Sequence, residues 1–128
     1  LHPLLGAAAV ALVFFAGLRG LRSRKKHPDA IASRAFHRRW APVALGLVAA
    51  SYIAGLVSVS LLREDLAPGG SWHFVLASGL VGMMGVLWYS SPLRTGRAPP
   101  SMRGHVITGF TAMLTGIFTA ALGLGLLP

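Results

Sequence analysis

The sequence predicts an all-α membrane protein, a single domain folded as an up-and-down bundle of four transmembrane helices. Of its 128 residues only 12% are charged, and the mean hydropathy is +0.65, which lies outside the range of soluble globular domains. The apolar residues are concentrated in four runs, each close to the length that crosses a bilayer. Basic loops separate two of the three pairs of consecutive runs.

The longest predicted helix contains the second run, about residues 40–62. Asp29 can act as its N-cap, so that the helix extends from Ala30 to Leu62, about 50 Å at the α-helical rise. A hydrocarbon core is about 30 Å thick, and the first two turns must therefore lie in the aqueous or headgroup layer. Pro42 withdraws a backbone donor from this helix, which predicts a kink.

The other three runs are shorter, and their ends are marked by capping residues and aromatic side chains. We expect them at about residues 3–18, 72–89 and 104–127. Ser71 can cap the third helix and Ser101 the fourth. All three tryptophans lie within a residue or two of a proposed span end, as is typical of the membrane interface.

The distribution of cations predicts the orientation. Eleven of the twelve Lys and Arg lie in or beside the first and third loops, and only Arg63 lies in the second. The positive-inside rule then places those two loops in the cytoplasm or stroma and both termini on the non-cytoplasmic side. At a membrane face, the expected partners of these basic loops are membrane lipids rather than nucleic acid.

The composition also excludes several chemistries. The chain has no cysteine, which rules out disulfides, thiolate zinc sites and iron–sulfur clusters. It shows no phosphate-binding loop, no paired catalytic carboxylates and no nucleophile beside a base, so hydrolase and transferase activities are not indicated. Met83 and Met84 lie at mid-span, where packing is the expected role of a thioether side chain.

One histidine lies near the start of each run: His2, His37, His73 and His105. Because antiparallel spans alternate in direction, the first and third start at one membrane face and the second and fourth at the other. Helices of such a pair are diagonal partners in a bundle, and two diagonal imidazoles can bind a haem iron from opposite sides. We therefore expect two b-type haems, ligated by His2 with His73 and by His37 with His105. The fifth histidine, His27, is expected to be solvated in a loop.

Small residues recur one helical turn after each of the four histidines. They are Gly6, Ala41, Ala77 and Gly109. Residues four apart lie on the same face of a helix, so a small side chain at these positions would let a porphyrin edge approach its ligand closely. The repetition supports a flat cofactor beside each histidine.

Three arginines lie next to the inner pair of histidines in the sequence, namely Arg38, Arg39 and Arg103. They can bind haem propionates through charge-assisted hydrogen bonds. They can equally serve only to determine topology. The sequence leaves both roles open.

The four histidines and their spacing resemble the core of the cytochrome b561 family. The local matches are LHPLLG around His2, SWHF around His73, RGHVITGF around His105, and the ending FTAALGLGL. The resemblance covers essentially the whole chain and is closest to small b561-like proteins of cyanobacteria and plastids. It implies two b haems in a thylakoid or plasma membrane and one-electron transfer between an unidentified donor and acceptor, a transmembrane oxidoreductase. The family's two flanking helices are not recognised, and its basic ascorbate-site pattern is limited to Arg38 and Arg39.

Two other interpretations remain open. In the first, the chain is a chlorophyll-binding or structural subunit of a photosynthetic complex, in which a histidine binds magnesium singly. In the second, it is a cofactor-free membrane scaffold with interfacial histidines. Assembly into a larger membrane complex or a homodimer is compatible with each interpretation.

Overall fold

The computed structural model describes residues 2–24, 28–62, 70–91 and 102–125, apart from the side chains of His2 and Leu62. Within these ranges the regular structure consists of helices: α1 (His2–Arg22), α2 (Ala30–Leu62), α3 (Trp72–Tyr89) and α5 (Met102–Leu124). Each is long and apolar enough to cross a membrane. The predicted all-α, multi-pass bundle is confirmed.

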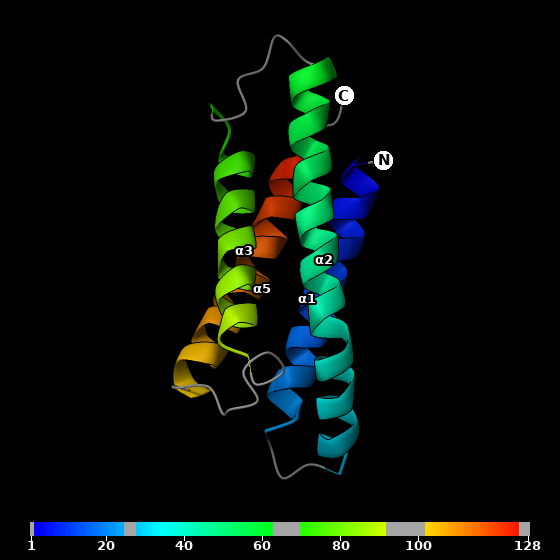
Figure 1. Ribbon diagram of the computed structural model, residues 1–128, viewed down its shortest axis with the longest axis vertical. Helices are drawn as coiled ribbons and strands as arrows, with labels where there is room; N and C mark the ends of the chain where they lie inside the picture. The colour runs from blue at the N-terminus through cyan, green and yellow to red at the C-terminus, as the bar shows by residue number, and fades with distance from the viewer. Residues whose placement is uncertain (1, 25–27, 63–69, 92–101, 126–128) are drawn as a thin grey trace.

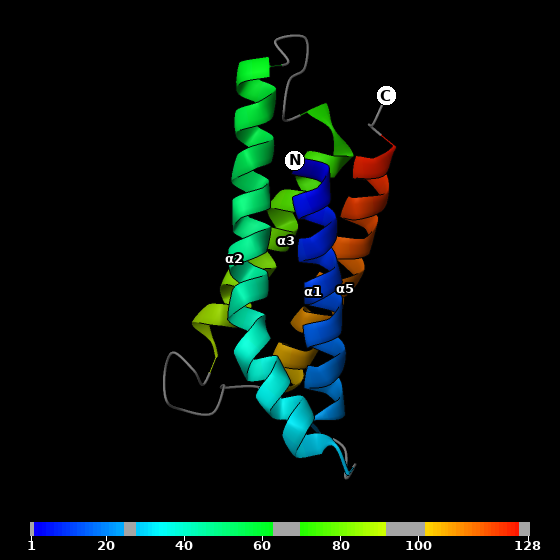
Figure 2. The ribbon, with the colours of Figure 1, turned by 90° about the vertical axis from the view of Figure 1, so that its right-hand side faces the viewer.

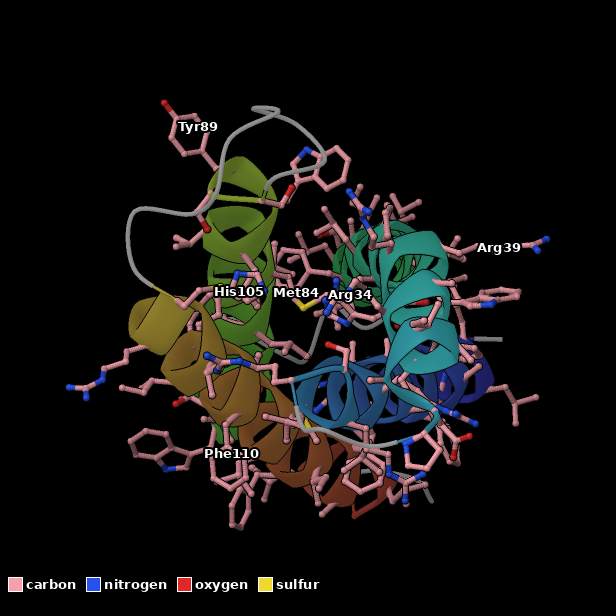
Figure 3. The ribbon with its side chains drawn as sticks, turned by 90° about the horizontal axis from the view of Figure 1, so that it is seen from below. Arg34, Arg39, Met84, Tyr89, His105 and Phe110 are labelled. Atoms are coloured by element: carbon pink, nitrogen blue, oxygen red, sulfur yellow. The ribbon has the colours of Figure 1, made fainter. Side chains whose placement is uncertain are left out.

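Consecutive helices run in opposite directions, and the order around the bundle is α1, α2, α3, α5 (Figures 1 and 3). Each helix packs against its two neighbours in that order. As a result α1 lies diagonally opposite α3, and α2 lies diagonally opposite α5 (Figure 3). The start of α1 and the end of α5 lie at the same end of the bundle (Figure 1). These are the diagonal relations that pairing of the histidines requires.

The bounds of α2 agree with the sequence prediction. The carbonyl of Asp29 accepts the backbone N–H of Ser33 at 2.8 Å, which is the first hydrogen bond of the helix and puts Asp29 at the N-cap position. Pro42 lies inside the helix. The cyan part of α2 veers away from the axis of the green part in Figure 2, as a missing backbone hydrogen bond predicts.

Helix α3 has the predicted bounds, Trp72–Tyr89, and α1 and α5 differ from prediction only at their ends. Ser71 caps α3, and its hydroxyl accepts the N–H of Phe74 at 3.2 Å. Helix α1 continues to Arg22, one turn beyond the predicted span. The prediction ended earlier because it followed the apolar residues, and the last turn of the helix is cationic. Helix α5 ends at Leu124, and Ser101, its expected cap, lies outside the described residues.

The buried core occupies the middle of the bundle and is built from small and medium-sized side chains of all four helices. Its members are Ala9, Val13, Ala44, Val48, Leu80, Met84, Ala112 and Met113. Close packing occurs at Gly17 of α1, where an added Cβ would lie 2.9 Å from Cγ of Met113 on α5. The core separates the two ends of the bundle, and at those ends the helices leave room for cavities.

Helices α2 and α3 are also tied by a polar contact. The hydroxyls of Tyr52 and Ser78 lie 2.8 Å apart. Since the Ser78 hydroxyl donates its proton to the carbonyl of Phe74 at 2.9 Å, Tyr52 is the donor in the contact between helices. The Tyr52 ring stacks on Phe74 with the ring centres 5.9 Å apart.

Candidate functional site: a histidine-lined cavity at each end of the bundle

The first cavity, here called the paired-histidine cavity, has a volume of about 700 Å³ and is lined by all four helices. His37 of α2 and His105 of α5 face each other within it, with ring centres 6.4 Å apart and ring planes at 85°. His105, Met84 and Arg34 all line this cavity, and in the view from below their side chains lie between the helices (Figure 3). The fold therefore brings together the two histidines that the sequence predicts for one membrane face.

The tautomer of His37 follows from its hydrogen bond. Its Nδ1 lies 2.8 Å from the backbone carbonyl oxygen of Ala16 on α1. A carbonyl oxygen can only accept, so Nδ1 carries the proton and the neutral ring has its lone pair on Nε2. Metal-binding histidines are commonly oriented in this way, by a backbone carbonyl on the other ring nitrogen.

His105 has a different environment. Its Nδ1 is buried and has no hydrogen-bond partner among the described residues. A buried polar atom left without a partner costs about 1–3 kcal/mol, and such atoms in folded proteins commonly mark the place of a water, an ion or another ligand. The orphaned nitrogen belongs to the ring that faces His37.

The spacing of the two rings fits a metal held between them. An imidazole nitrogen binds a first-row metal at about 2.0 Å and lies about 1.1 Å from its own ring centre, so two axial imidazoles have ring centres about 6.2 Å apart. The observed separation is 6.4 Å. Within the described chain no group of three or more His, Cys, Asp or Glu side chains is placed to hold a metal ion.

Both small residues predicted for this end line the cavity. Ala41 follows His37 by one turn, and Gly109 follows His105 by one turn. A Cβ built on Gly109 would meet no described atom within 4 Å. The space beside Gly109 is therefore cavity space rather than packed protein, as the flat-cofactor interpretation expects.

The arginines of this end divide into two groups. Arg24, Arg34 and Arg38 line the cavity, whereas Arg39 and Arg103, both within the described chain, do not. Successive residues of an α-helix are rotated by about 100°, so a side chain two positions from a histidine lies on the opposite side of the helix. Arg39 and Arg103 are each two positions from a histidine. Arg39 accordingly points outward in Figure 3 and covers the Trp40 ring at 5.6 Å.

Arg24 and Arg34 were not among the sequence-predicted residues. Arg34 precedes His37 by three positions, a spacing that puts both side chains on one face of a helix, so it could have been found from sequence. Arg24 follows α1 and reaches the cavity only because α1 and α2 pack together. No sequence pattern near His37 or His105 indicates it.

The second cavity, here called the His73 cavity, lies at the other end and has a volume of about 590 Å³. Its lining includes His73 and both predicted small residues, Gly6 and Ala77. His73 Nδ1 lies 2.9 Å from the backbone carbonyl oxygen of Thr119 on α5, so this ring also carries its proton on Nδ1. The described lining residues include no Lys or Arg.

Two predicted residues fall outside this description. The side chain of His2 is not described, so its pairing with His73 stays a prediction. His27 lies outside the described residues altogether.

Sequence reasoning missed the two carbonyl groups that orient the histidines, and it missed Gly20 and Gly123, which adjoin the histidine rings. These depend on the pairing of neighbouring helices, which no local motif encodes.

The fold and its cavities define a class, a multi-pass helical membrane protein with a histidine-lined cavity at each end of a four-helix bundle. Comparison with family models, with curated proteins and with solved structures finds no match for this chain.

Proposed function

We propose that this protein binds two b-type haems, one in each cavity, and passes single electrons from one membrane face to the other. The observation that carries the proposal is the pair of diagonal histidines, His37 and His105, with ring centres 6.4 Å apart in a cavity of about 700 Å³. A haem bound there would supply one-electron redox chemistry. One electron leaves the donor and one reaches the acceptor.

The chain's own residues supply binding, orientation and charge. The imidazoles of His37 and His105 provide two nitrogen ligands, and the Ala16 carbonyl holds the first of them in the right tautomer. Arg24 and Arg38, with Arg34, give the cavity cationic groups for the two haem carboxylates. Most of the remaining lining residues are apolar, and they would surround a bound haem with an environment of low polarity.

The His73 cavity is the proposed second site, with His2 as the partner ligand. Its volume, its Nδ1-bonded histidine and its two small residues repeat the features of the first cavity. Because the two cavities lie at opposite ends of the bundle, two haems would form a path across the membrane. We extend the proposal to membership of the b561-like family and to a thylakoid or plasma membrane, on the resemblance of the histidine spacing and of the local matches around His2, His73 and His105.

The first test is spectroscopic. Protein expressed in a haem-producing host and purified in detergent is expected to show a reduced-minus-oxidised difference spectrum of b type. A pyridine haemochrome assay is expected to give two haems per chain. Purified protein without haem would contradict the proposal.

The second test compares two glycines that both have open space around an added Cβ, one in a cavity lining and one outside it. A Cβ at Gly109 or at Gly79 would meet no described atom within 4 Å, yet only Gly109 lines a cavity. We expect Gly109→Leu to insert and fold while its haem content falls from two toward one. Gly79→Leu is the control and keeps two. Retention of both haems in Gly109→Leu would show that the paired-histidine cavity is not the site.

A second candidate function is chlorophyll binding. Chlorophyll magnesium needs only a single axial ligand, and His73, held through Nδ1 by the Thr119 carbonyl, can supply one in the His73 cavity. Pigment extraction distinguishes the two functions. Chlorophyll without haem in the protein from its native membrane would favour this candidate, and neither pigment would favour a cofactor-free scaffold.

A further inference from the structure

Two histidines in different helices and at opposite ends of the bundle, His37 and His73, are held in the same way. Each donates from Nδ1 to a backbone carbonyl of the adjacent antiparallel helix, at 2.8 Å and 2.9 Å respectively. In both cases a glycine follows the accepting residue by one helical turn. The pairs are Ala16 with Gly20 on α1 and Thr119 with Gly123 on α5.

The two glycines are in direct contact with the imidazole rings. A Cβ on Gly20 would lie 2.9 Å from Nδ1 and 3.0 Å from Cε1 of His37. A Cβ on Gly123 would lie 2.8 Å from Cε1 and 3.0 Å from Nδ1 of His73. At each glycine one of these separations is below 3.0 Å, a distance that real Cβ atoms essentially never show, so a larger residue would require the imidazole ring or the helix to shift.

These contacts distinguish Gly20 and Gly123 from the general richness of the chain in glycine. For several other helical glycines an added Cβ would meet no described atom within 4 Å. They are Gly46, Gly79, Gly82, Gly85 and Gly109. Two other described glycines are closely packed, but Gly17 adjoins Met113 and Gly6 adjoins Ser51. Among the glycines compared, close contact with a histidine ring is therefore specific to Gly20 and Gly123, one at each cavity.

We propose that Gly20 and Gly123 are positioning residues for the cofactor ligands, one for each cavity. Each lets its histidine ring lie flat against the neighbouring helix, which keeps the Nδ1 hydrogen bond short and determines the plane of the imidazole. The Nδ1 bond in turn leaves Nε2 as the coordinating nitrogen and raises its basicity. This inference rests on the proposed haem function and adds the groups that orient its ligands.

The test compares Gly20→Ala and Gly123→Ala in the haem-loaded protein, with Gly46→Ala and Gly79→Ala as controls in open positions of α2 and α3. Redox titration gives the two midpoint potentials. Electron paramagnetic resonance of the ferric protein reports the angle between the axial imidazole planes, because the g values of low-spin haem depend on it. Haem content and secondary structure are recorded for every variant.

We expect each positioning variant to change one haem only. Gly20→Ala shifts the potential and g values of one centre, and Gly123→Ala shifts those of the other, with haem content falling from two toward one where the ligand is lost. The controls keep the wild-type values. If both positioning variants retain wild-type potentials and g values with two haems, or if each alters both centres equally, the inference is wrong.

A measurement on the unmodified chain covers the case in which an alanine variant does not insert. In the reduced, diamagnetic protein labelled with ¹⁵N-histidine, we expect Nδ1–H protons of His37 and His73 that exchange slowly with water. Rapid exchange at both would overturn the inference even with haem bound. Absence of haem from the wild-type protein would instead refute the proposed function, so the two failures can be told apart.

Discussion

The charges of Arg24, Arg34 and Arg38 act on whatever the paired-histidine cavity holds, because all three side chains line it. Ferric haem with two neutral axial ligands carries one more positive charge than the ferrous form. Nearby cations therefore favour the reduced state, and their removal favours the oxidised state. The His73 cavity has no cation among its described lining residues, so this effect distinguishes the two sites.

We predict that Arg34→Gln lowers the midpoint potential of one haem and leaves the other unchanged. Loss of one charge about 10 Å from the iron, partly screened by water, is worth about 1 kcal/mol, or about 40 mV for a one-electron couple. Potentiometric titration measures it. Arg39→Gln is the matched control, since Arg39 lies in the same helix as Arg34 but covers the Trp40 ring outside the cavity. Equal shifts in both variants would contradict a local role for Arg34.

At the scale of the helix, α3 is the shortest of the four membrane-length helices. Its 18 residues span about 27 Å at the α-helical rise, slightly less than a hydrocarbon core of about 30 Å. The ends of α3 therefore lie close to the membrane interface, where its backbone N–H groups need partners. Ser71 supplies one of them, through its hydrogen bond from Phe74 N–H at 3.2 Å.

We predict that Ser71→Ala lowers the free energy of unfolding by about 1 kcal/mol, the usual cost of removing an N-cap. Ser71→Asp should restore most of it, because a carboxylate accepts the same hydrogen bond and interacts favourably with the helix dipole. Denaturant titration in detergent micelles, followed by circular dichroism, measures the change. Identical stability of the alanine and wild-type proteins would show that water replaces the cap at no cost.

At the scale of the whole molecule, the described positive charges are concentrated at one end of the bundle. All the described arginines, from Arg19 to Arg103, belong to the end where α1 meets α2 and where α5 begins. That end also contains the paired-histidine cavity. The positive-inside rule predicts that this end faces the cytoplasm or stroma, and on that prediction the two cavities lie toward different compartments.

The absence of cysteine from the chain makes this orientation testable with single thiol probes. Pro28→Cys and Gly70→Cys introduce thiols at exposed positions on opposite ends of the bundle. In sealed, right-side-out membrane vesicles an impermeant maleimide is expected to label Gly70→Cys and to label Pro28→Cys only after the membrane is permeabilised. The reverse pattern would invert the predicted topology.

The sequence by itself determined the four membrane-length helices, their order and the alternation of their directions. These follow from hydropathy and span length, since a chain with four apolar runs can satisfy its backbone in lipid only by forming helices. The same reasoning identified the cavity residues Gly6, Ala41, Ala77 and Gly109, because a residue four positions from a histidine lies on its face whatever the helix packs against. It also anticipated the cap at Ser71.

Only the tertiary structure decided what lies across from each histidine. The carbonyls of Ala16 and Thr119, and the glycines beside them, depend on the relative register of two antiparallel helices. That register results from packing of many small side chains over the whole helix length and leaves no local signature. The structure likewise separated Arg38 from Arg39, neighbours in sequence that lie about 100° apart around their helix, so that only one of the two charges reaches the cavity.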